Sequence, residues 1–300
     1  MVSSKLRKYT IVKKIGQGAF GKVYKARLRD SPNTIVAIKS EENEKNKTRL
    51  RHEIVIYNLL DGAVGFPKLY DSITTSSKII IVMEYLGPNL EKLCRYCDKR
   101  FSLKTILMLA IQILNRIEKF HGLGYIHRDI KPDNFLIGVG EKKSRLYLID
   151  FGLAKKIITN GTHIRYRDKK SFTGSYRYSS IRNHKGIEQG RRDDLESIGY
   201  LLLYFLKGRL PWQGLGGSTK GEKKNRIFEK KNSTTLEDLC DGCPSAFYLY
   251  MKYCRILRFQ EKPNYTLLKD LFINLFKKSD FKLDFIYDWN IRAKYKNTKG

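Results

Sequence analysis

The pattern of apolar and polar positions divides the chain into two parts. Before residue 87, short apolar segments at 9–14, 23–26, 36–39 and 78–85 are separated by glycines or polar residues. Short segments of this kind, bounded by turn-forming residues, are typical of β-strands. The first part is therefore predicted to contain a small sheet.

One helix interrupts these strands. Apolar residues recur at helical spacing between residues 49 and 60, at Leu50, Ile54, Tyr57 and Leu60. Such spacing predicts an amphipathic helix with one face against the sheet. The Gly87-Pro88 pair then marks a change of structure.

After Pro88 the pattern becomes helical. A short helix is predicted at 90–95 and a long amphipathic one at 103–121. The apolar face of the long helix consists of Leu107, Ala110, Ile111, Leu114, Ile117 and Phe120. More helices are predicted at 198–206, 247–257 and 267–276. The fold class is therefore predicted to be α+β.

Four segments of the second part lack this helical spacing. Residues 135–137 and 146–149 are short apolar strands that flank a turn. Residues 155–182 are polar and basic. Residues 214–225 are polar and rich in glycine, and they are the most loop-like segment of the second half.

The chain carries no recognisable membrane or export signal. No stretch reaches the roughly 18 uninterrupted apolar residues that a membrane span needs. The N-terminus lacks the apolar core of a signal peptide, Val2 stands where myristoylation needs glycine, and the C-terminus has no prenylation motif. We therefore expect a soluble protein of the nucleus or cytoplasm, without a membrane anchor.

The five cysteines are an odd number in a chain without a secretory signal, which argues against a disulfide framework. Cys94 and Cys97 form one C-x-x-C pair, and Cys240 and Cys243 form another. A zinc site would need the two pairs about 15–20 residues apart. Free thiols are therefore favoured over zinc.

The chain is strongly basic. It has 59 Lys and Arg against 30 Asp and Glu, a net charge of +29. Such a charge attracts polyanions, namely nucleic acids, anionic membrane surfaces and acidic or phosphorylated proteins. A solvated lysine-rich surface explains the charge equally well. No zinc-finger or RNA-binding motif is present, so we expect no specific nucleic-acid partner.

Four short motifs point to phosphoryl transfer. The run His127–Asn134 has the form H-R-D-x-x-x-x-N, and Asp150-Phe151-Gly152 follows an apolar strand. Gly16–Gly21 has the form G-x-G-x-x-G, a weak signal that a plain hairpin turn also explains, and Val36–Lys39 reads Val-Ala-Ile-Lys. Together these motifs resemble those of protein kinases.

The resemblance to protein kinases implies a role for each polar residue of these motifs. Asp129 would accept the proton of the incoming hydroxyl, and Lys131 would reach the transferred phosphoryl group. Asn134 and Asp150 would hold magnesium ions against the nucleotide phosphates. Every one of these positions has the residue type that catalysis needs, so a pseudokinase that acts as a scaffold is the weaker alternative.

The same resemblance implies an ATP site in the first part of the chain. Lys39 would pair the nucleotide phosphates, and Glu53 would form an ion pair with Lys39, although a solvated glutamate is the alternative. Met83 would control access behind the adenine, or would simply be a core residue. The implied ATP-binding residues are Ile15, Gly16, Gly18, Gly21, Val23, Ala37, Lys39, Glu53, Met83, Glu84 and Leu86.

A further set of segments narrows the resemblance. Residues 173–181 and 186–197 are close to motifs of the casein kinase 1 family, and Leu210–Leu215 also matches. Ser180-Ile181-Arg182 stands where that family has Ser-Ile-Asn and most kinases have Ala-Pro-Glu. From about residue 9 to 290 the chain resembles the casein kinase 1 family of Ser/Thr protein kinases.

This family resemblance implies a monomeric enzyme that uses ATP and magnesium. It implies a preference for substrates that are acidic or already phosphorylated three residues before the acceptor, and activity without phosphorylation of the activation segment. The residues implied for substrate phosphate binding are Arg177, Lys170 and Lys223 with Gln213 and Gly214 nearby, and Arg128 and Lys155 in a second basic pocket. The positions that depart from the family are Arg165, Arg182, Gly190, Gly216 and Gly217.

The expected architecture is one kinase domain with a bilobal fold. Residues 9–86 would form the N-lobe and hinge, with a small antiparallel sheet and the helix called αC in kinases. Residues 87–290 would form a larger, mainly helical C-lobe, and 291–300 a short basic tail. No long C-terminal extension follows, so autoinhibition by such a segment is not expected.

Overall fold

The structure is a computed structural model, and its description covers residues 7–18, 21–43 and 49–297. The chain divides into two compact units. The first unit contains the chain up to Pro88 together with residues 136–152, and the second contains the remainder. The sequence pattern alone grouped residues 136–152 with the helical part.

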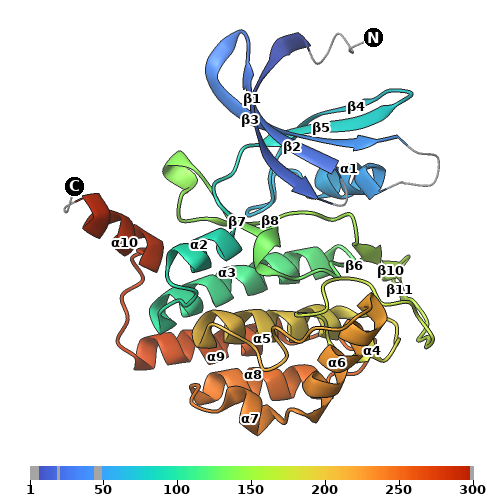
Figure 1. Cartoon of the computed structure of the whole chain (residues 1–300), viewed down its shortest axis with the longest axis vertical. Helices are drawn as coiled ribbons and strands as arrows, with labels where there is room; N and C mark the ends of the chain where they lie inside the picture. The colour runs from blue at the N-terminus through green and yellow to red at the C-terminus, as the bar shows by residue number, and fades with distance from the viewer. Residues whose placement is uncertain (1–6, 19–20, 44–48, 298–300) are drawn as a thin grey trace. The chain divides into compact units, whose positions relative to one another are not determined.

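A five-stranded antiparallel sheet, in the order β1-β2-β3-β5-β4, is the framework of the first unit (Figure 1). Its strands are β1 (Tyr9–Gly18), β2 (Gly21–Leu28), β3 (Ser31–Glu42), β4 (Leu69–Thr74) and β5 (Lys78–Glu84). Four of these strands lie at the apolar segments that predicted them. The fifth, β4, was not predicted.

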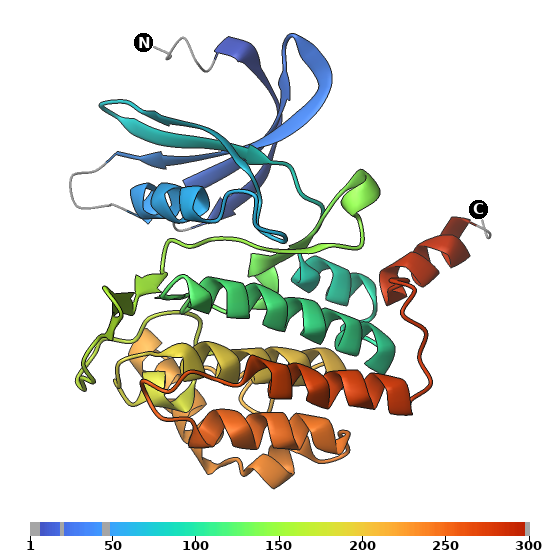
Figure 2. The same ribbon diagram turned by 180° about the vertical axis from the view of Figure 1, so that it is seen from behind.

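Apolar residues from all five strands form a cluster in this unit. Its buried members are Tyr9, Ala26, Val36, Ile38, Ile73, Ile80 and Val82. Helix α1 (Arg49–Leu59) packs against β4 and β5, as Figure 2 shows, and it buries Leu50, Ile56 and Tyr57. Burying a large apolar side chain contributes about 1.5–3 kcal/mol. This packing fixes the register of α1 against the sheet.

Two short strands complete the first unit. Strand β8 (Leu146–Leu148) pairs with β7 (Phe135–Ile137), which begins one residue before the chain enters this unit. A 3-10 turn at Gly140–Lys142 lies between them. The backbone of Leu148 donates a 2.9 Å hydrogen bond to the Gly65 carbonyl.

The second unit is mainly helical. Its helices are α2 (Leu90–Tyr96), α3 (Leu103–Gly122), α4 (Ile181–His184), α5 (Arg191–Lys207), α6 (Lys220–Ser233), α7 (Leu236–Cys240), α8 (Ser245–Ile256), α9 (Tyr265–Lys278) and α10 (Asp288–Asn297). Its short strands are β6 (Tyr125–Ile126), β9 (Lys155–Lys156), β10 (Ile158–Thr159) and β11 (Thr162–His163). Strand β6 pairs with β9, and β10 pairs with β11.

The long helices of this unit form its core. Helix α3 contacts α5 and α9, and α8 contacts α5 and α9 (Figure 2). Helix α3 begins where the Ser102 hydroxyl accepts a hydrogen bond from the Thr105 amide. A serine at this position satisfies a backbone donor that the helix itself leaves unpaired. None of the described helices is long and apolar enough to cross a membrane.

Two parts of this unit differ from the sequence pattern. The prediction that residues 214–225 form a loop is wrong from Lys220 onward, because α6 begins there. Thr219 caps this helix by accepting a hydrogen bond from the Glu222 amide. At the other end of the unit, the residues expected to form a basic tail continue helix α10 as far as Asn297.

Candidate active site

Three charged side chains of the first unit meet beside its sheet. Lys39 extends from β3, and its Nζ lies 2.6 Å from Glu53 Oε1 on α1 and 3.2 Å from Asp150 Oδ1. The expected ion pair between Lys39 and Glu53 is therefore present. Glu53 is 1% exposed, so this pair lies in a medium of low polarity.

Burial and charge set the protonation of this group together. Burial lowers the pKa of Lys39, but the negative charges of Glu53 and Asp150 outweigh it and hold the pKa above its ordinary value. Lys39 is therefore a permanent cation. Burial raises the pKa of Glu53 to about 7, although the charge of Lys39 opposes the rise. A fixed cation at this position suits the binding of an anionic phosphate chain.

Asp150 owes its position to the aromatic residue that follows it. The ring of Phe151 is fully buried and lies 5.1 Å from the Tyr57 ring and 6.2 Å from the Phe66 ring, between centroids. Asp150 has a φ of 67°, in the left-handed region that non-glycine residues rarely adopt. A residue held there by its surroundings is a frequent feature of functional sites.

The remaining residues of the implied ATP site lie on four strands of the same unit, or directly after one. Ala37 of β3 lies opposite Met83 of β5, and Val23 of β2 lies opposite Gly16 and Lys39. These residues lie on β1 (Ile15, Gly16, Gly18), β2 (Gly21, Val23), β3 (Ala37, Lys39) and β5 (Met83, Glu84). Leu86 is the second residue after β5. The tip of the glycine-rich segment, residues 19–20, lies outside the described residues.

Two members of that set have contacts that the sequence did not indicate. A side chain at Gly21 would place its Cβ 2.2 Å from the Ser40 carbonyl oxygen, so β2 and β3 can approach only with glycine there. The Glu84 carboxylate lies 2.7 Å from Lys142 Nζ. Any contact of Glu84 with a nucleotide would therefore come from its backbone.

In the second unit, Asp129 is the centre of a separate polar cluster. It is 5% exposed, and its carboxylate accepts hydrogen bonds from Lys131 Nζ at 2.5 Å and from Ser175 Oγ at 2.7 Å. Asn134 Nδ2 donates to the Asp129 carbonyl oxygen at 2.8 Å. The three residues of the predicted catalytic loop thus lie together, and Ser175 from the activation segment joins them.

A second buried carboxylate holds the loop in place. Asp194, in the first turn of α5, accepts hydrogen bonds from the His127 and Arg128 amides at 2.7 and 2.9 Å. Its Oδ2 also lies 2.9 Å from His121 Nε2. Burial raises the pKa of Asp194, but these hydrogen bonds outweigh it and leave the pKa below its ordinary value. The ionised Asp194 therefore positions the backbone just before Asp129.

The available ligand atoms suit magnesium. Because Asn134 donates through its amide nitrogen, its amide oxygen is the atom left for a cation. Asp150 supplies a carboxylate whose side chain is 25% exposed. Carboxylate and amide oxygens are ligands that magnesium accepts, together with water and substrate phosphates. Among the described residues no group of three or more His, Cys, Asp or Glu is arranged to hold a metal ion, and the five cysteines are free.

A comparison with protein families identifies the fold that carries these two clusters. The family model of the protein kinase domain matches residues 9–269. The chain belongs to the protein kinase family. Its five-stranded sheet with one helix and its mainly helical second unit are the α+β kinase fold that the motifs predicted.

Three basic residues of this kinase line one pocket in the second unit. The pocket has a volume of about 380 Å³, and its lining includes Arg128, Lys155 and Lys170. Glu188 is the carboxylate on its wall, with Oε2 2.8 Å from Lys155 Nζ and 3.9 Å from Lys170 Nζ. Three cations against one carboxylate leave the pocket positive. Lys170 therefore lies with Arg128 and Lys155, whereas the sequence grouped it with Arg177 and Lys223.

Arg177 has different surroundings from this pocket. Its guanidinium carbon lies 5.7 Å from the Tyr178 ring centroid and 5.9 Å from that of Tyr204. Lys223 is an exposed residue of α6, close in sequence to Gln213 and Gly214. Among the described residues, no hydrogen bond or ion pair joins the Arg177 side chain to Lys223, Gln213 or Gly214.

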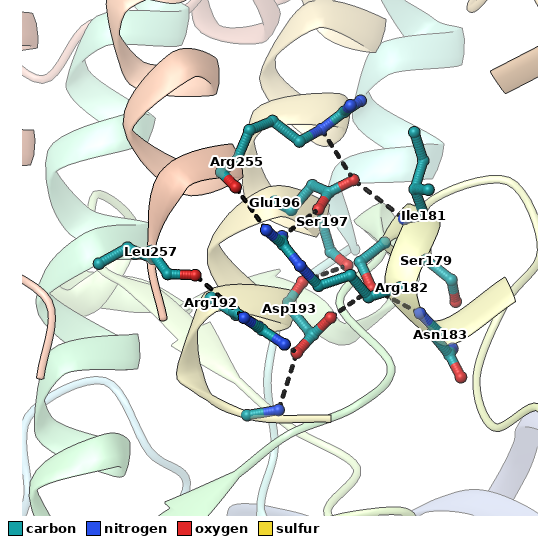
Figure 3. A network of polar contacts seen from close by, with 12 residues as sticks. Ser179, Ile181, Arg182, Asn183, Arg192, Asp193, Glu196, Ser197, Arg255 and Leu257 are labelled. Carbon is teal, nitrogen blue, oxygen red and sulfur yellow. Dashed lines mark hydrogen bonds and ion pairs between the residues drawn. The ribbon is translucent and has the colours of Figure 1, made fainter. Parts of the chain in front are cut away.

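The kinase activation segment ends in a network of charges around one buried carboxylate, drawn in Figure 3. Glu196 of α5 is fully buried, and its Oε1 accepts a 3.0 Å hydrogen bond from the Ile181 amide. The guanidinium groups of Arg182 and Arg255 lie 3.7 and 3.2 Å from the Glu196 carboxylate, and Arg182 also donates to the Arg255 carbonyl. Arg182, which departs from the family pattern, therefore ties the segment to both α5 and α8.

Two of the other departures have a steric reason. A Cβ at Gly190 would lie 2.9 Å from the Phe259 carbonyl oxygen, and one at Gly217 would lie 2.5 Å from the Lys223 amide nitrogen. Both positions therefore favour glycine in this chain. The remaining two, Gly216 and Arg165, lie at exposed positions.

Sequence reasoning missed several residues that support the site. Ser175 and Asp194 both fall inside segments that resemble casein kinase 1 motifs, but such a resemblance does not say which partner a side chain contacts. Lys231, in a segment with no apolar periodicity, gave no signal in the sequence at all.

Proposed function

We propose that this kinase transfers the γ-phosphoryl group of ATP, with magnesium, to serine or threonine residues of acidic or already phosphorylated proteins. The observation that carries the proposal is the environment of Asp129. A buried carboxylate that accepts hydrogen bonds from a lysine and a hydroxyl has the partners needed to receive a proton from an acceptor hydroxyl.

Each residue of the two clusters has a distinct task in this reaction. Lys39, held by Glu53, binds the phosphate chain of the nucleotide, and Asp150 and Asn134 provide oxygen ligands for magnesium. Asp129 orients the acceptor hydroxyl and takes its proton. Lys131 places a positive charge beside that carboxylate. This charge stabilises the negative charge that develops on the transferred phosphoryl group. Bound ATP with magnesium supplies the activated phosphoryl group.

The preference for phosphorylated substrates is supported by the pocket of Arg128, Lys155 and Lys170. A phosphate carries about two negative charges and three acceptor oxygens, which suits a cluster of cationic donors. Burial lowers the pKa of Arg128, against the raising effect of Glu188 and Asp194. A partly buried guanidinium of this kind gains from an additional anion. Arg177 and Lys223 form the second candidate site for the same phosphate.

Paired peptides test this proposal. A peptide of the form pSer-x-x-Ser should be phosphorylated with a lower KM than Ser-x-x-Ser, because its phosphate lies about 10 Å from the acceptor in an extended chain. The double variant Lys155→Gln/Lys170→Gln should lose this advantage, whereas Lys282→Gln, an exposed lysine elsewhere in the second unit, should keep it. The double variant Arg177→Gln/Lys223→Gln tests the second candidate site by the same measurement.

Three results would contradict the proposal. Equal efficiency of the wild-type enzyme on both peptides would exclude the preference for phosphorylated substrates. Retention of the preference in both double variants would exclude both candidate sites. Phosphorylation confined to tyrosine residues of a mixed peptide library would exclude the assignment to serine and threonine.

We further infer that the enzyme acts as a monomer, as the resemblance to casein kinase 1 implied, and that it works in the nucleus or cytoplasm, as we expected from the sequence. Sedimentation at micromolar concentration and imaging of the tagged protein test these two points separately.

A further inference from the structure

A fully buried lysine lies beneath the activation segment. Lys231, in the last turn of α6, is 0% exposed. Its Nζ donates hydrogen bonds to the carbonyl oxygens of Tyr176 and Ser179 at 3.0 and 2.6 Å. A lysine is almost never buried completely unless it is paired. Here the partners are backbone oxygens on both sides of Arg177.

The remaining surroundings of Lys231 complete a cage for its head group. His184 Nε2 lies 3.3 Å from Nζ, and the ring centroids of Tyr200 and Trp212 each lie 5.0 Å from it. An ammonium group has three donors, and two of them match the two carbonyl oxygens. The third faces His184 Nε2, which also lies 3.2 Å from the Tyr176 carbonyl oxygen. Two aromatic faces at this distance attract a cation. The geometry therefore suits a lysine dedicated to one arrangement of the backbone.

The charged groups around Lys231 come from three other elements. Glu196 of α5 attracts its charge, whereas Arg255 of α8 repels it, and His184 of α4 is held neutral because burial and the nearby charge of Lys231 lower its pKa. Burial itself lowers the pKa of Lys231 to about 7. Keeping a buried cation in such a place costs stability, so stability alone does not account for a lysine there.

The backbone that Lys231 holds is joined directly to the catalytic cluster. Trp212 Nε1 donates a 2.7 Å hydrogen bond to the Arg177 carbonyl, so the carbonyls of residues 176, 177 and 179 are all bound from within the second unit. Ser175, the residue just before this stretch, donates to Asp129. Any shift of the stretch would therefore move both Arg177 and the hydroxyl that contacts Asp129.

We propose that Lys231 is a positioning residue that fixes the stretch Tyr176–Ser179 against the second unit, and with it Arg177 and the neighbouring Ser175, so that protein substrates are placed correctly for transfer. This inference rests on the proposed function, since it concerns the same reaction. Lys231 acts through the backbone and does not touch the substrate. Its loss should lower kcat/KM for protein substrates without altering the KM for ATP.

The variant Lys231→Met tests this role, because methionine has a similar length but no donors and no charge. We expect its kcat/KM for a peptide substrate to fall about tenfold to hundredfold, since a displacement near 1 Å in a substrate-positioning group has effects of that size. The KM for ATP should stay within about twofold of the wild type, since Lys39, Glu53 and Asp150 are unchanged. The slow hydrolysis of ATP without peptide should fall less than the peptide kcat/KM does, since only the Ser175 contact to Asp129 links it to the stretch. Lys230→Met, at an exposed position of the same helix, is the matched control.

A second variant covers the case in which Lys231→Met does not fold. Trp212→Phe removes the donor to the Arg177 carbonyl but keeps an aromatic face for Lys231, and it should also lower peptide kcat/KM while sparing the KM for ATP. The two substitutions act on one stretch, so their effects should be less than additive.

The outcomes separate this inference from the proposed function. Normal peptide kinetics in Lys231→Met, or in Trp212→Phe where the first variant is unfolded, would overturn the positioning role. Equal losses in peptide kinetics and ATP hydrolysis would overturn it as well, because they would indicate a general structural defect. Failure of the wild-type enzyme to phosphorylate any serine or threonine peptide would instead refute the proposed function.

Discussion

At the scale of single residues, the site depends on a few carboxylates whose surroundings differ. The Asp129 carboxylate accepts hydrogen bonds from Lys131 and Ser175, whereas the Asp194 carboxylate binds backbone amides and the His121 ring. Glu53 forms a buried ion pair with Lys39. A carboxylate can accept about four hydrogen bonds, so Asp129 retains sites for an acceptor hydroxyl.

Replacing Asp129 with asparagine should separate chemistry from nucleotide binding. The substitution Asp129→Asn keeps the size of the side chain but removes its ability to take a proton, so turnover should fall by about 10²–10⁴-fold. ATP affinity, measured by titration calorimetry, should stay near the wild-type value because Lys39, Glu53 and Asp150 are unchanged.

The matched control for this substitution is Asp270→Asn, an exposed carboxylate on α9. It should retain full turnover. Near-normal turnover in Asp129→Asn would show that another group receives the proton, and the assignment of Asp129 would then be wrong.

The residues of the site were predictable from the sequence to the extent that motifs name them. The pairing of Lys39 with Glu53 was implied by the resemblance to protein kinases, and the two side chains lie 2.6 Å apart. The contact between Ser175 and Asp129 joins residues 46 positions apart, and no local pattern encodes it. The placement of Lys170 with Arg128 and Lys155 depends on how the activation segment folds back, which composition does not reveal.

At the scale of elements, the strength of the apolar pattern decides what could be predicted. Helix α3 buries most of its residues and was predicted almost to its ends. Helix α6 buries only Ile227 and Lys231 among its 14 residues, so its polar sequence resembled a loop. Strand β4 lies at the edge of the sheet, where only Ile73 is buried. Elements with little burial leave little trace in the sequence.

The network around Glu196 joins three elements, and removing its charge should destabilise them together. Glu196→Gln leaves Arg182 and Arg255 without their counter-charge, and breaking a buried pair in this way costs about 3–5 kcal/mol. Because the two arginine side chains are 22% and 25% exposed, we expect a loss near the low end, about 3 kcal/mol. Urea denaturation followed by fluorescence measures this loss.

The control for this stability prediction is Glu229→Gln, an exposed glutamate on α6, which should change stability by less than about 0.5 kcal/mol. A loss below about 1 kcal/mol in Glu196→Gln would mean that the arginines find other partners or water, as surface ion pairs do.

At the scale of the whole molecule, the excess of basic residues acts at long range. A net charge of +29 attracts any acidic peptide, wherever its negative charges lie. The pocket of Arg128, Lys155 and Lys170 acts at short range, and it distinguishes one position of a phosphate from another. The two effects respond differently to salt, because screening acts on exposed and distant charges far more than on partly buried contacts.

Salt should therefore separate general attraction from specific recognition. Two phosphopeptides of equal net charge are compared, one with the phosphate three residues before the acceptor serine and one with the phosphate three residues after it. Raising the salt from about 0.1 M to about 1 M shortens the Debye length from about 10 Å to about 3 Å. The kcat/KM of both peptides should fall at least about tenfold, since charge steering mainly accelerates encounter.

The ratio of the kcat/KM values of the two peptides measures the specific recognition of the phosphate position. We expect this ratio to change by less than about threefold over that range of salt, because both peptides lose the same long-range attraction. The pocket binds only the phosphate that lies three residues before the acceptor serine. A ratio that approaches one at high salt would show that the preference comes from the overall charge of the molecule. The pocket would then be a basic surface without a dedicated ligand, and substrate choice would depend on the ionic strength around the enzyme.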